Sequence, residues 1–113
     1  MIKKELVTMA VSNVAGGNGP AKMTNLLEGQ ELPKKAGLAA FVELEPGSSI
    51  GYHQHIGEGE MYHILSGCGE YTENDVTTTV SAGMVTMVYD QDSHRLVNTG
   101  TQPLKLLAVI IKD

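Results

Sequence analysis

Three histidines and one glutamate are spaced so that they could hold a metal ion. His53 and His55 are two residues apart, and residues i and i+2 of a β-strand point to the same face, so both imidazoles can reach one point. Glu60 follows five residues later and adds a carboxylate, and His94 lies thirty-four residues after Glu60. Three neutral imidazoles and a carboxylate suit Mn, Fe, Co, Ni, Cu or Zn, and further coordination positions would hold water or substrate. The pattern predicts a divalent transition metal site.

The elements that must position these side chains are predicted to be short strands. Turn signals recur every eight to twelve residues, and the runs between them are rich in Val, Ile, Thr and Tyr. Because no long segment has a 3.6-residue period, we expect an all-β sandwich or barrel. The clearest expected strands are 38–44, 61–65, 71–72 paired with 76–80, 84–89 and 104–111. Residues 25–35 are expected to hold a helical turn or nothing regular, and residues 16–20 a flexible loop or a crossing.

The run that begins at Glu60 divides its residues between two faces. Alternation puts Tyr62 on the face of Glu60, where its ring would line a cavity, either as core packing or in contact with a substrate. His63 has the opposite parity and is expected on the surface or at an interface. Glu58 lies between two glycines, and we expect a solvated loop acid there or one that closes over the site.

These residues resemble the two sequence motifs of the cupin family. The first motif combines glycine, His-any-His, glutamate and glycine, and it is met at every spacing by Gly47, His53, His55, Glu60 and Gly67. The second combines glycine, histidine and asparagine, and it is met by Gly83, His94 and Asn98. This chain departs from the second motif at a turn, where Tyr89 stands in place of a proline and Gln91 in place of a glycine.

The resemblance implies one cupin domain over residues 1–113, folded as a double-stranded β-helix, the cupin jelly-roll barrel. It also implies metal ligation by His53, His55, Glu60 and His94. Residues 45–55 are similar to small bacterial cupins described as oxalate decarboxylase-like, which favours Mn or Fe and a small carboxylate as ligand.

Three functions are compatible with this resemblance. The first is a metal-dependent enzyme acting on a small carboxylate or another oxygen-rich metabolite, with Glu58 and Tyr62 as candidate catalytic residues. The alternatives are a non-catalytic protein that binds a small ligand at its metal, and an Fe(II)-dependent dioxygenase. Arg95, the one arginine, neighbours His94 and should point away from the cavity, so no cation is expected to clamp a second carboxylate. We therefore expect binding of a compact bidentate carboxylate and poor turnover of oxalate.

Composition narrows the possible partners and compartments. The net charge is −5 with no cluster of Lys and Arg, so nucleic acid is not expected as a partner. The longest apolar run has six residues, too short to span a membrane, and no signal-peptide core is present. Cys68 is the single cysteine, which excludes an intrachain disulfide and suits the cytoplasm. Exposed sheet edges and the apolar final strand, 104–111, predict a homodimer.

Overall fold

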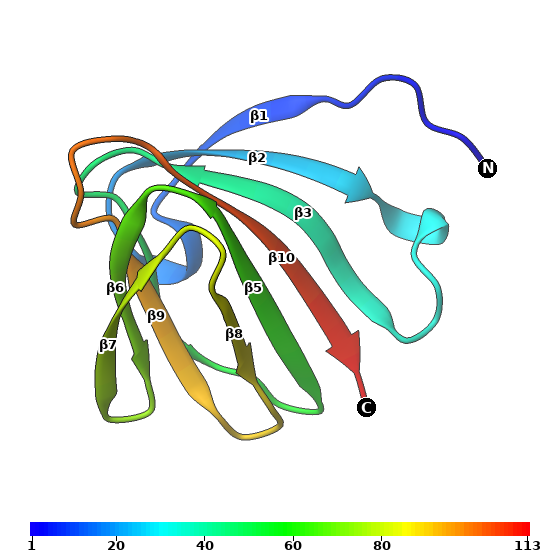
Figure 1. Ribbon diagram of the computed structural model, residues 1–113. Helices are drawn as coiled ribbons and strands as arrows, with labels where there is room; N and C mark the ends of the chain where they lie inside the picture. The colour runs from blue at the N-terminus through cyan, green and yellow to red at the C-terminus, as the bar shows by residue number, and fades with distance from the viewer.

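Two antiparallel sheets make up the computed structural model, which describes residues 1–113 (Figure 1). The strands are β1 (Thr8–Ser12), β2 (Pro20–Leu27), β3 (Ala36–Leu44), β4 (Ser49–Gln54), β5 (Glu58–Ser66), β6 (Cys68–Glu73), β7 (Val76–Ser81), β8 (Val85–Val88), β9 (Ser93–Val97) and β10 (Leu104–Lys112). Two short 3₁₀ turns complete the chain, η1 (Val14–Gly16) and η2 (Gly29–Glu31). The all-β class expected from the sequence is confirmed.

The strand order explains how distant segments meet. The larger sheet runs β1-β2-β3-β10-β5-β8 and the smaller one β4-β9-β6-β7. Strands that are consecutive in the chain often lie in different sheets, as β4 and β5 do, so the chain crosses repeatedly between layers. The β1–β2 hairpin is an element that the sequence pattern did not predict, and η2 occupies the middle of the segment expected to hold a helical turn.

The last strand lies where the sequence did not place it. We expected the apolar strand at 104–111 to support an interface between subunits, but β10 lies inside the larger sheet and pairs with β3 on one side and β5 on the other. Its backbone groups are therefore already used within the chain. The edges of the two sheets are β1, β8, β4 and β7. That argument for a dimer is wrong, because apolar content alone does not distinguish a central strand from an interface strand.

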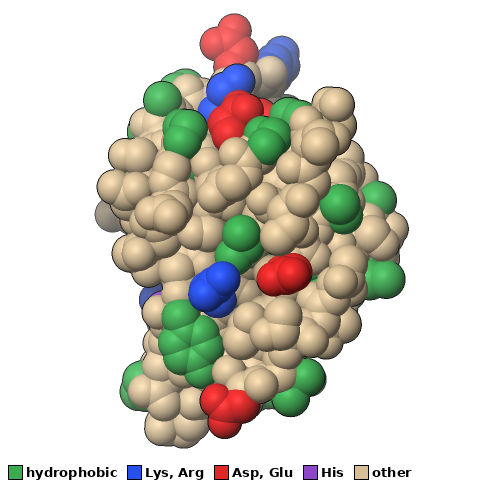
Figure 2. Space-filling model, turned by 90° about the vertical axis from the view of Figure 1, so that its left-hand side faces the viewer, with side chains coloured by type: hydrophobic (Ala, Val, Ile, Leu, Met, Phe, Trp, Pro, Cys, Tyr) green, Lys and Arg blue, Asp and Glu red, His purple; other side chains and the backbone are tan.

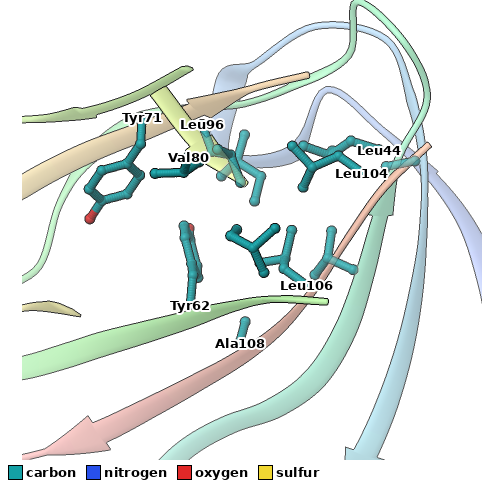
Figure 3. Close-up of a cluster of buried hydrophobic side chains, with 12 residues drawn as sticks. Leu44, Tyr62, Tyr71, Val80, Leu96, Leu104, Leu106 and Ala108 are labelled. Carbon is teal, nitrogen blue, oxygen red and sulfur yellow. The ribbon is translucent and has the colours of Figure 1, made fainter. Parts of the chain in front are cut away.

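The core fills the space between the sheets and ends at the predicted metal site. On β5, Glu60, Tyr62 and Ile64 are buried while Met61 and His63 are partly exposed, which confirms the predicted alternation. Figure 3 shows Tyr71 on one sheet and Tyr62 on the other at one end of this core. The buried hydrophobic cluster consists of Ala21, Val42, Leu44, Ile50, Tyr62, Ile64, Tyr71, Val80, Leu96, Leu104, Leu106 and Ala108.

The loop between β1 and β2 packs tightly against the other sheet. A Cβ atom on Gly17 would lie 2.3 Å from the Ser49 carbonyl oxygen, and one on Gly51 would lie 2.3 Å from the Ala15 carbonyl oxygen. Only glycine permits so close an approach of two backbones. Ser49 also receives a hydrogen bond from the Asn18 N–H through its Oγ, at 2.9 Å. Of the two expectations for residues 16–20, a flexible loop or a crossing, the loop is therefore present but is fixed on β4, next to His53.

The outer surface is mostly polar and uncharged on the side viewed in Figure 2, where hydrophobic and charged groups are scattered rather than gathered. On β7, Thr77 and Thr79 are exposed and have the opposite parity to the buried Val80, whereas Thr78, which is also exposed, lines a cavity together with Val80. None of the chain's helices has the length and apolar character needed to cross a membrane.

Candidate metal centre

Strand pairing brings the predicted ligands together. His53 on β4 lies directly opposite His94 on β9 in the antiparallel register, so both side chains project from the same face of the smaller sheet. His55 follows the end of β4, and its backbone continues the pairing by donating to the Asp92 carbonyl oxygen at 2.9 Å. Glu60 approaches from β5 in the larger sheet. The site therefore joins the two layers, which local spacing by itself does not require.

Four donor atoms converge at this point, all within 4.8 Å of one another. The Glu60 Oε1 atom lies 3.1 Å from Nε2 of His55, 3.1 Å from Nε2 of His94 and 3.7 Å from Nε2 of His53. The Nε2 atoms of His55 and His94 are 3.0 Å apart. His55, Glu60 and His94 are buried, and His53 is half-buried, so the site is open on the His53 side.

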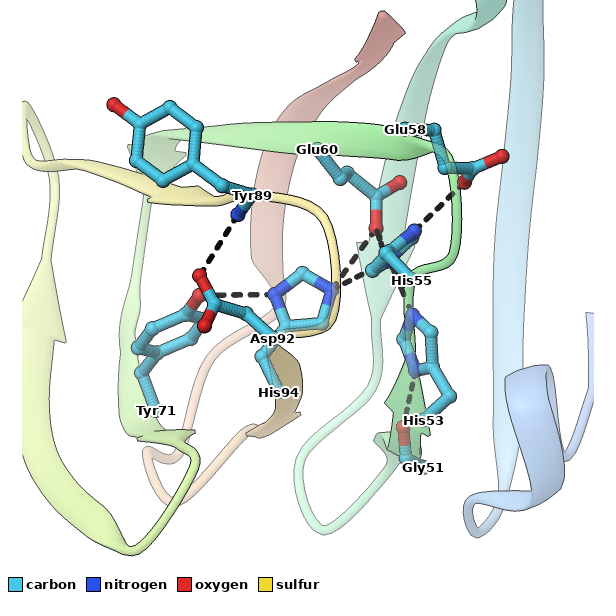
Figure 4. A network of polar contacts seen from close by, with 9 residues as sticks. All are labelled: Gly51, His53, His55, Glu58, Glu60, Tyr71, Tyr89, Asp92 and His94. Atoms are coloured by element: carbon cyan, nitrogen blue, oxygen red, sulfur yellow. Dashed lines mark hydrogen bonds and ion pairs between the residues drawn. The ribbon is translucent and has the colours of Figure 1, made fainter. Parts of the chain in front are cut away.

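Each imidazole is held in place from behind through its other nitrogen (Figure 4). His53 Nδ1 lies 2.7 Å from the Gly51 carbonyl oxygen, and His55 Nδ1 lies 2.7 Å from Glu58 Oε2. His94 Nδ1 lies 2.9 Å from the Tyr71 hydroxyl. A carbonyl oxygen and a carboxylate only accept hydrogen bonds, so Nδ1 of His53 and of His55 carries the proton. Their Nε2 lone pairs are then free to point into the site.

This donor set fits a divalent transition metal ion. The Nε2 atoms of His53 and His55 face into the site, 3.0 to 3.7 Å from a carboxylate oxygen or a further imidazole nitrogen. Metal-binding histidines characteristically donate their second nitrogen to a carbonyl or carboxylate, which fixes the tautomer and the ring orientation. One carboxylate and three imidazoles can hold Mn, Fe, Co, Ni, Cu or Zn.

The pKa values of the site follow from burial and from these contacts. Burial raises the pKa of Glu60, but contacts with His53 and His94 outweigh it and lower the pKa to about 2. The neighbouring Glu60 carboxylate raises the pKa of His53 above its usual 6.5, whereas burial lowers that of His94. Glu60 is therefore ionised and His94 neutral at neutral pH, the forms that bind a cation.

Two tyrosines form the inner wall of the site. Tyr62, a candidate catalytic residue from the sequence, is buried and stacks on the His94 ring at 4.8 Å between centroids and 16° between planes. Burial raises its pKa well above 10. Tyr71 was not predicted from the sequence, because its place beside His94 depends on the pairing of β6 with β9. The one local signal in the sequence for its inward position is that Gly69 and Tyr71 alternate with the polar Glu70 on β6, and both prove to be buried.

Glu58, the other candidate catalytic residue, is engaged with His55. It begins β5 rather than lying in an open loop, and its carboxylate accepts the hydrogen bond from His55 Nδ1. Its side chain is 29% exposed, so it sits at the rim of the site. In this position it orients a predicted ligand, and its catalytic role stays a prediction.

Comparison with known proteins agrees with the motifs. Residues 40–110 match the family model of the cupin domain. The chain belongs to the cupin family. It is 41% identical over 107 residues to an oxalate-binding protein of Thermotoga maritima, covering 95% of this chain and 88% of that protein. Among solved structures, a predicted oxalate decarboxylase from Thermotoga maritima superposes with a TM-score of 0.92 at 40% identity, over 96% of this chain and 95% of the other. The cupin domain of Schizosaccharomyces pombe Cnp3 shares the fold, with a TM-score of 0.74 at 16% identity over 98% and 90% of the two chains.

The departure of this cupin from the family turn is accommodated by its backbone. Gln91, which replaces the family glycine, adopts a φ of 76°, the left-handed conformation that glycine favours. The turn is closed by the Asp92 side chain, whose Oδ2 accepts from the Tyr89 N–H at 2.9 Å (Figure 4). That hydrogen bond lowers the pKa of Asp92. A proline at position 89, the family residue, would lack this N–H, so the two departures belong to one alternative turn.

The cavities of this cupin are distinct from one another. The largest, about 430 Å³, lies between β7 and β8 and includes none of the four converging residues in its lining. A second cleft, of about 350 Å³, is lined by Arg95 together with glycines of the β1–β2 loop. The cavity that does border His53 and Glu60 is smaller, about 90 Å³. Arg95 is exposed and lies outside it, as its parity to His94 predicted.

Proposed function

We propose that this cupin binds one divalent transition metal ion through His53, His55, Glu60 and His94, and that the bound metal holds a small carboxylate. The observation that carries the proposal is the arrangement of the imidazoles. Outward contacts hold all three rings by Nδ1, and all three Nε2 atoms face the Glu60 carboxylate. This is the orientation that metal-binding histidines need.

The carboxylate ligand is supported by coordination chemistry and by similarity. Four protein donors on a metal that accepts six leave two positions, which a compact bidentate anion fills by displacing water. When bound, the metal acts as a Lewis acid that neutralises the charge of the anion. The relative with 41% identity is named an oxalate-binding protein, which favours oxalate or a close analogue as the ligand. Mn and Fe remain the favoured metals from the resemblance to small bacterial cupins.

Binding without rapid turnover is the form of this function that the side chains support. Decarboxylation needs a group that moves a proton near neutral pH. Tyr62 has a pKa raised well above 10 by burial, and the Glu58 carboxylate is occupied by His55. These two residues are the catalytic candidates from the sequence. Tyr62 does not lose its proton near neutral pH, and the Glu58 carboxylate is hydrogen-bonded to His55. A decarboxylase would thus require a proton donor other than these two.

Metal analysis tests the first half of the proposal. Protein purified without a metal-chelating tag and supplemented with Mn or Fe should contain about one metal ion per chain. The His53→Ala variant should lose most of that metal, whereas His63→Ala, on the opposite face of β5, should retain it. A metal content below about a tenth per chain in well-folded protein would contradict the proposal.

Calorimetry tests the second half. Oxalate should bind to the Mn-loaded protein and not to the metal-free protein, and carbon dioxide release from oxalate should be slow or absent. Equal binding with and without metal would show that the carboxylate is held by another site. Rapid carbon dioxide release would show that the protein is a decarboxylase.

Two further proposals concern the chain as a whole. We propose that residues 1–113 act as one cupin domain, since the two sheets enclose one hydrophobic cluster. The homodimer also stays a prediction, now resting on the four sheet edges rather than on β10. Light scattering at micromolar concentration distinguishes a dimer from a monomer.

A further inference from the structure

The cavity beside the metal centre is almost entirely apolar. Apart from His53 and Glu60, all its lining residues are hydrophobic, among them Val14, Leu38, Val42 and Ile50. Its volume is about 90 Å³, far below the usual 300–1,000 Å³ of sites for drug-sized ligands. The cavity therefore suits a small group, and outside the metal centre the Tyr62 hydroxyl is the one polar group in its lining.

No lysine or arginine lines this cavity. Its ionisable neighbours are His53 and Glu60, which belong to the metal centre, and the buried hydroxyl of Tyr62, whose pKa burial raises. Arg95 lines the separate outer cleft. A carboxylate placed among these walls would lose its hydration without gaining a charged partner, at a cost of several kcal/mol. A second carboxylate that extends away from the metal is therefore disfavoured.

We infer that the site selects a short monocarboxylate with an oxygen on its α carbon and a small alkyl group, such as a 2-oxo acid of three or four carbons. The inference rests on the proposed function and specifies its ligand class. The carboxylate and the α oxygen occupy the metal end of the site, and the alkyl group fills the apolar cavity. Oxalate also binds, because both of its carboxylates remain at the metal, but it leaves the cavity unfilled.

The β1–β2 loop supplies one wall of this cavity and sets its size. Val14 and Ala15 belong to η1, and both line the cavity. Ala15 has a φ of 51°, an unfavourable conformation for a residue with a Cβ. The close contact between Gly17 and Gly51 keeps η1 in place against β4. The loop thus positions Val14 as a specificity-determining residue, although it contributes no metal ligand.

The first test compares ligands on the Mn-loaded wild-type protein by calorimetry, with oxalate, pyruvate, 2-oxobutyrate, 2-oxopentanoate and 2-oxoglutarate. Burying one more CH₂ contributes about 0.8 kcal/mol, so 2-oxobutyrate should bind about four-fold more tightly than pyruvate. 2-Oxoglutarate keeps the same metal-binding 2-oxo acid group as 2-oxopentanoate and has the same number of carbons, but it carries a second carboxylate at the chain end that enters the cavity, so it should bind at least ten-fold more weakly than 2-oxopentanoate. Binding of 2-oxoglutarate as tight as that of 2-oxopentanoate would overturn the inference.

The second test changes the cavity. Val14→Phe should fill the cavity and weaken the binding of 2-oxobutyrate at least ten-fold. Val7→Phe, at an exposed position before β1 that lines none of the cavities, serves as the matched control and should leave this binding unchanged. Leu38→Ala should enlarge the cavity and shift the preference to 2-oxopentanoate, a gain that an unfolded variant cannot mimic. Chain-length preferences that are the same in all three variants would overturn the inference.

Metal content and oxalate titration distinguish a failure of this inference from a failure of the proposed function. If Mn binds and oxalate binds through it, but alkyl length has no effect, the inference is wrong while the proposed function stands. If no ligand binds in a metal-dependent way, the proposed function fails and the inference fails with it.

Discussion

Replacing Glu58 by glutamine should weaken metal binding about ten-fold without unfolding the protein. Glu58 Oε2 accepts a hydrogen bond of 2.7 Å from His55 Nδ1, which orients the imidazole and keeps its lone pair on Nε2. Glutamine has nearly the same shape and can still accept through its amide oxygen, but it removes the negative charge. The substitution therefore isolates the charge of this contact from its geometry.

The magnitude follows from the kind of hydrogen bond that is lost. Hydrogen bonds to charged groups contribute about 1.5–3 kcal/mol and neutral ones about 0.5–1.5 kcal/mol. The difference, roughly 1.4 kcal/mol, corresponds to a factor of about ten in the dissociation constant. Glu58→Ala removes the contact altogether and should weaken metal binding by up to about one hundred-fold. Because Glu58 lies at the rim and is partly exposed, neither change leaves a buried charge unpaired.

Competition with a fluorescent chelator measures the metal affinity of each variant, and Glu70→Gln on the exposed side of β6 is the matched control. Affinity should decrease in the order wild type and Glu70→Gln, then Glu58→Gln, then Glu58→Ala. Equal affinity in all four proteins would refute the orienting role of Glu58. If instead the wild type releases carbon dioxide from oxalate rapidly and Glu58→Gln abolishes this with metal content unchanged, Glu58 is a catalyst.

Three further predictions concern pH, the turn at Gln91 and the buried Asn98. Metal affinity should fall as the pH falls through the raised pKa of His53, because a protonated imidazole has no lone pair; a flat affinity between pH 8 and 5 would contradict this. Gln91→Gly should raise the free energy of unfolding by about 0.5 kcal/mol, as measured by urea titration. Glycine adopts the left-handed φ of this position without strain, and this gain outweighs the added freedom of the unfolded chain. Asn98→Ala should lower the free energy of unfolding by about 3 kcal/mol in the same assay. The Asn98 side chain donates to the Leu44 and Gln102 carbonyl oxygens and accepts from the Gly100 N–H, and alanine loses all three contacts. A loss below about 1 kcal/mol would show that water replaces them.

The sequence was most informative where chemistry depends on short-range geometry. The period of two on a strand correctly placed Glu60 and Tyr62 inward and His63 outward on β5, because side chains alternate between faces whatever the sheet's neighbours are. The same argument correctly directed Arg95 away from the cavity. The two motifs added long-range information, since they implied that His94 meets His53 across the fold.

Tertiary structure decided which groups support those residues. Tyr71 reaches His94 only because β6 pairs with β9, and Glu58 reaches His55 only because β5 begins beside the end of β4. Neither contact is visible in a single strand, since each depends on the register between segments. The β1–β2 hairpin was missed for the same reason, and with it the position of Val14 at the cavity.

The final strand shows the limit most clearly. Its apolar and β-branched residues, 104–111, predicted a strand correctly but suggested an interface between subunits. Burial between β3 and β5 requires the same apolar composition, so the sequence could not distinguish the two environments. Strand order decides between them, and strand order is set by the summed pairing of segments far apart in the chain. The amino-acid sequence thus determined which side chains of this cupin converge and which face of a strand they occupy. The packing of the two sheets determined which residues hydrogen-bond to them and the size of the cavity beside them.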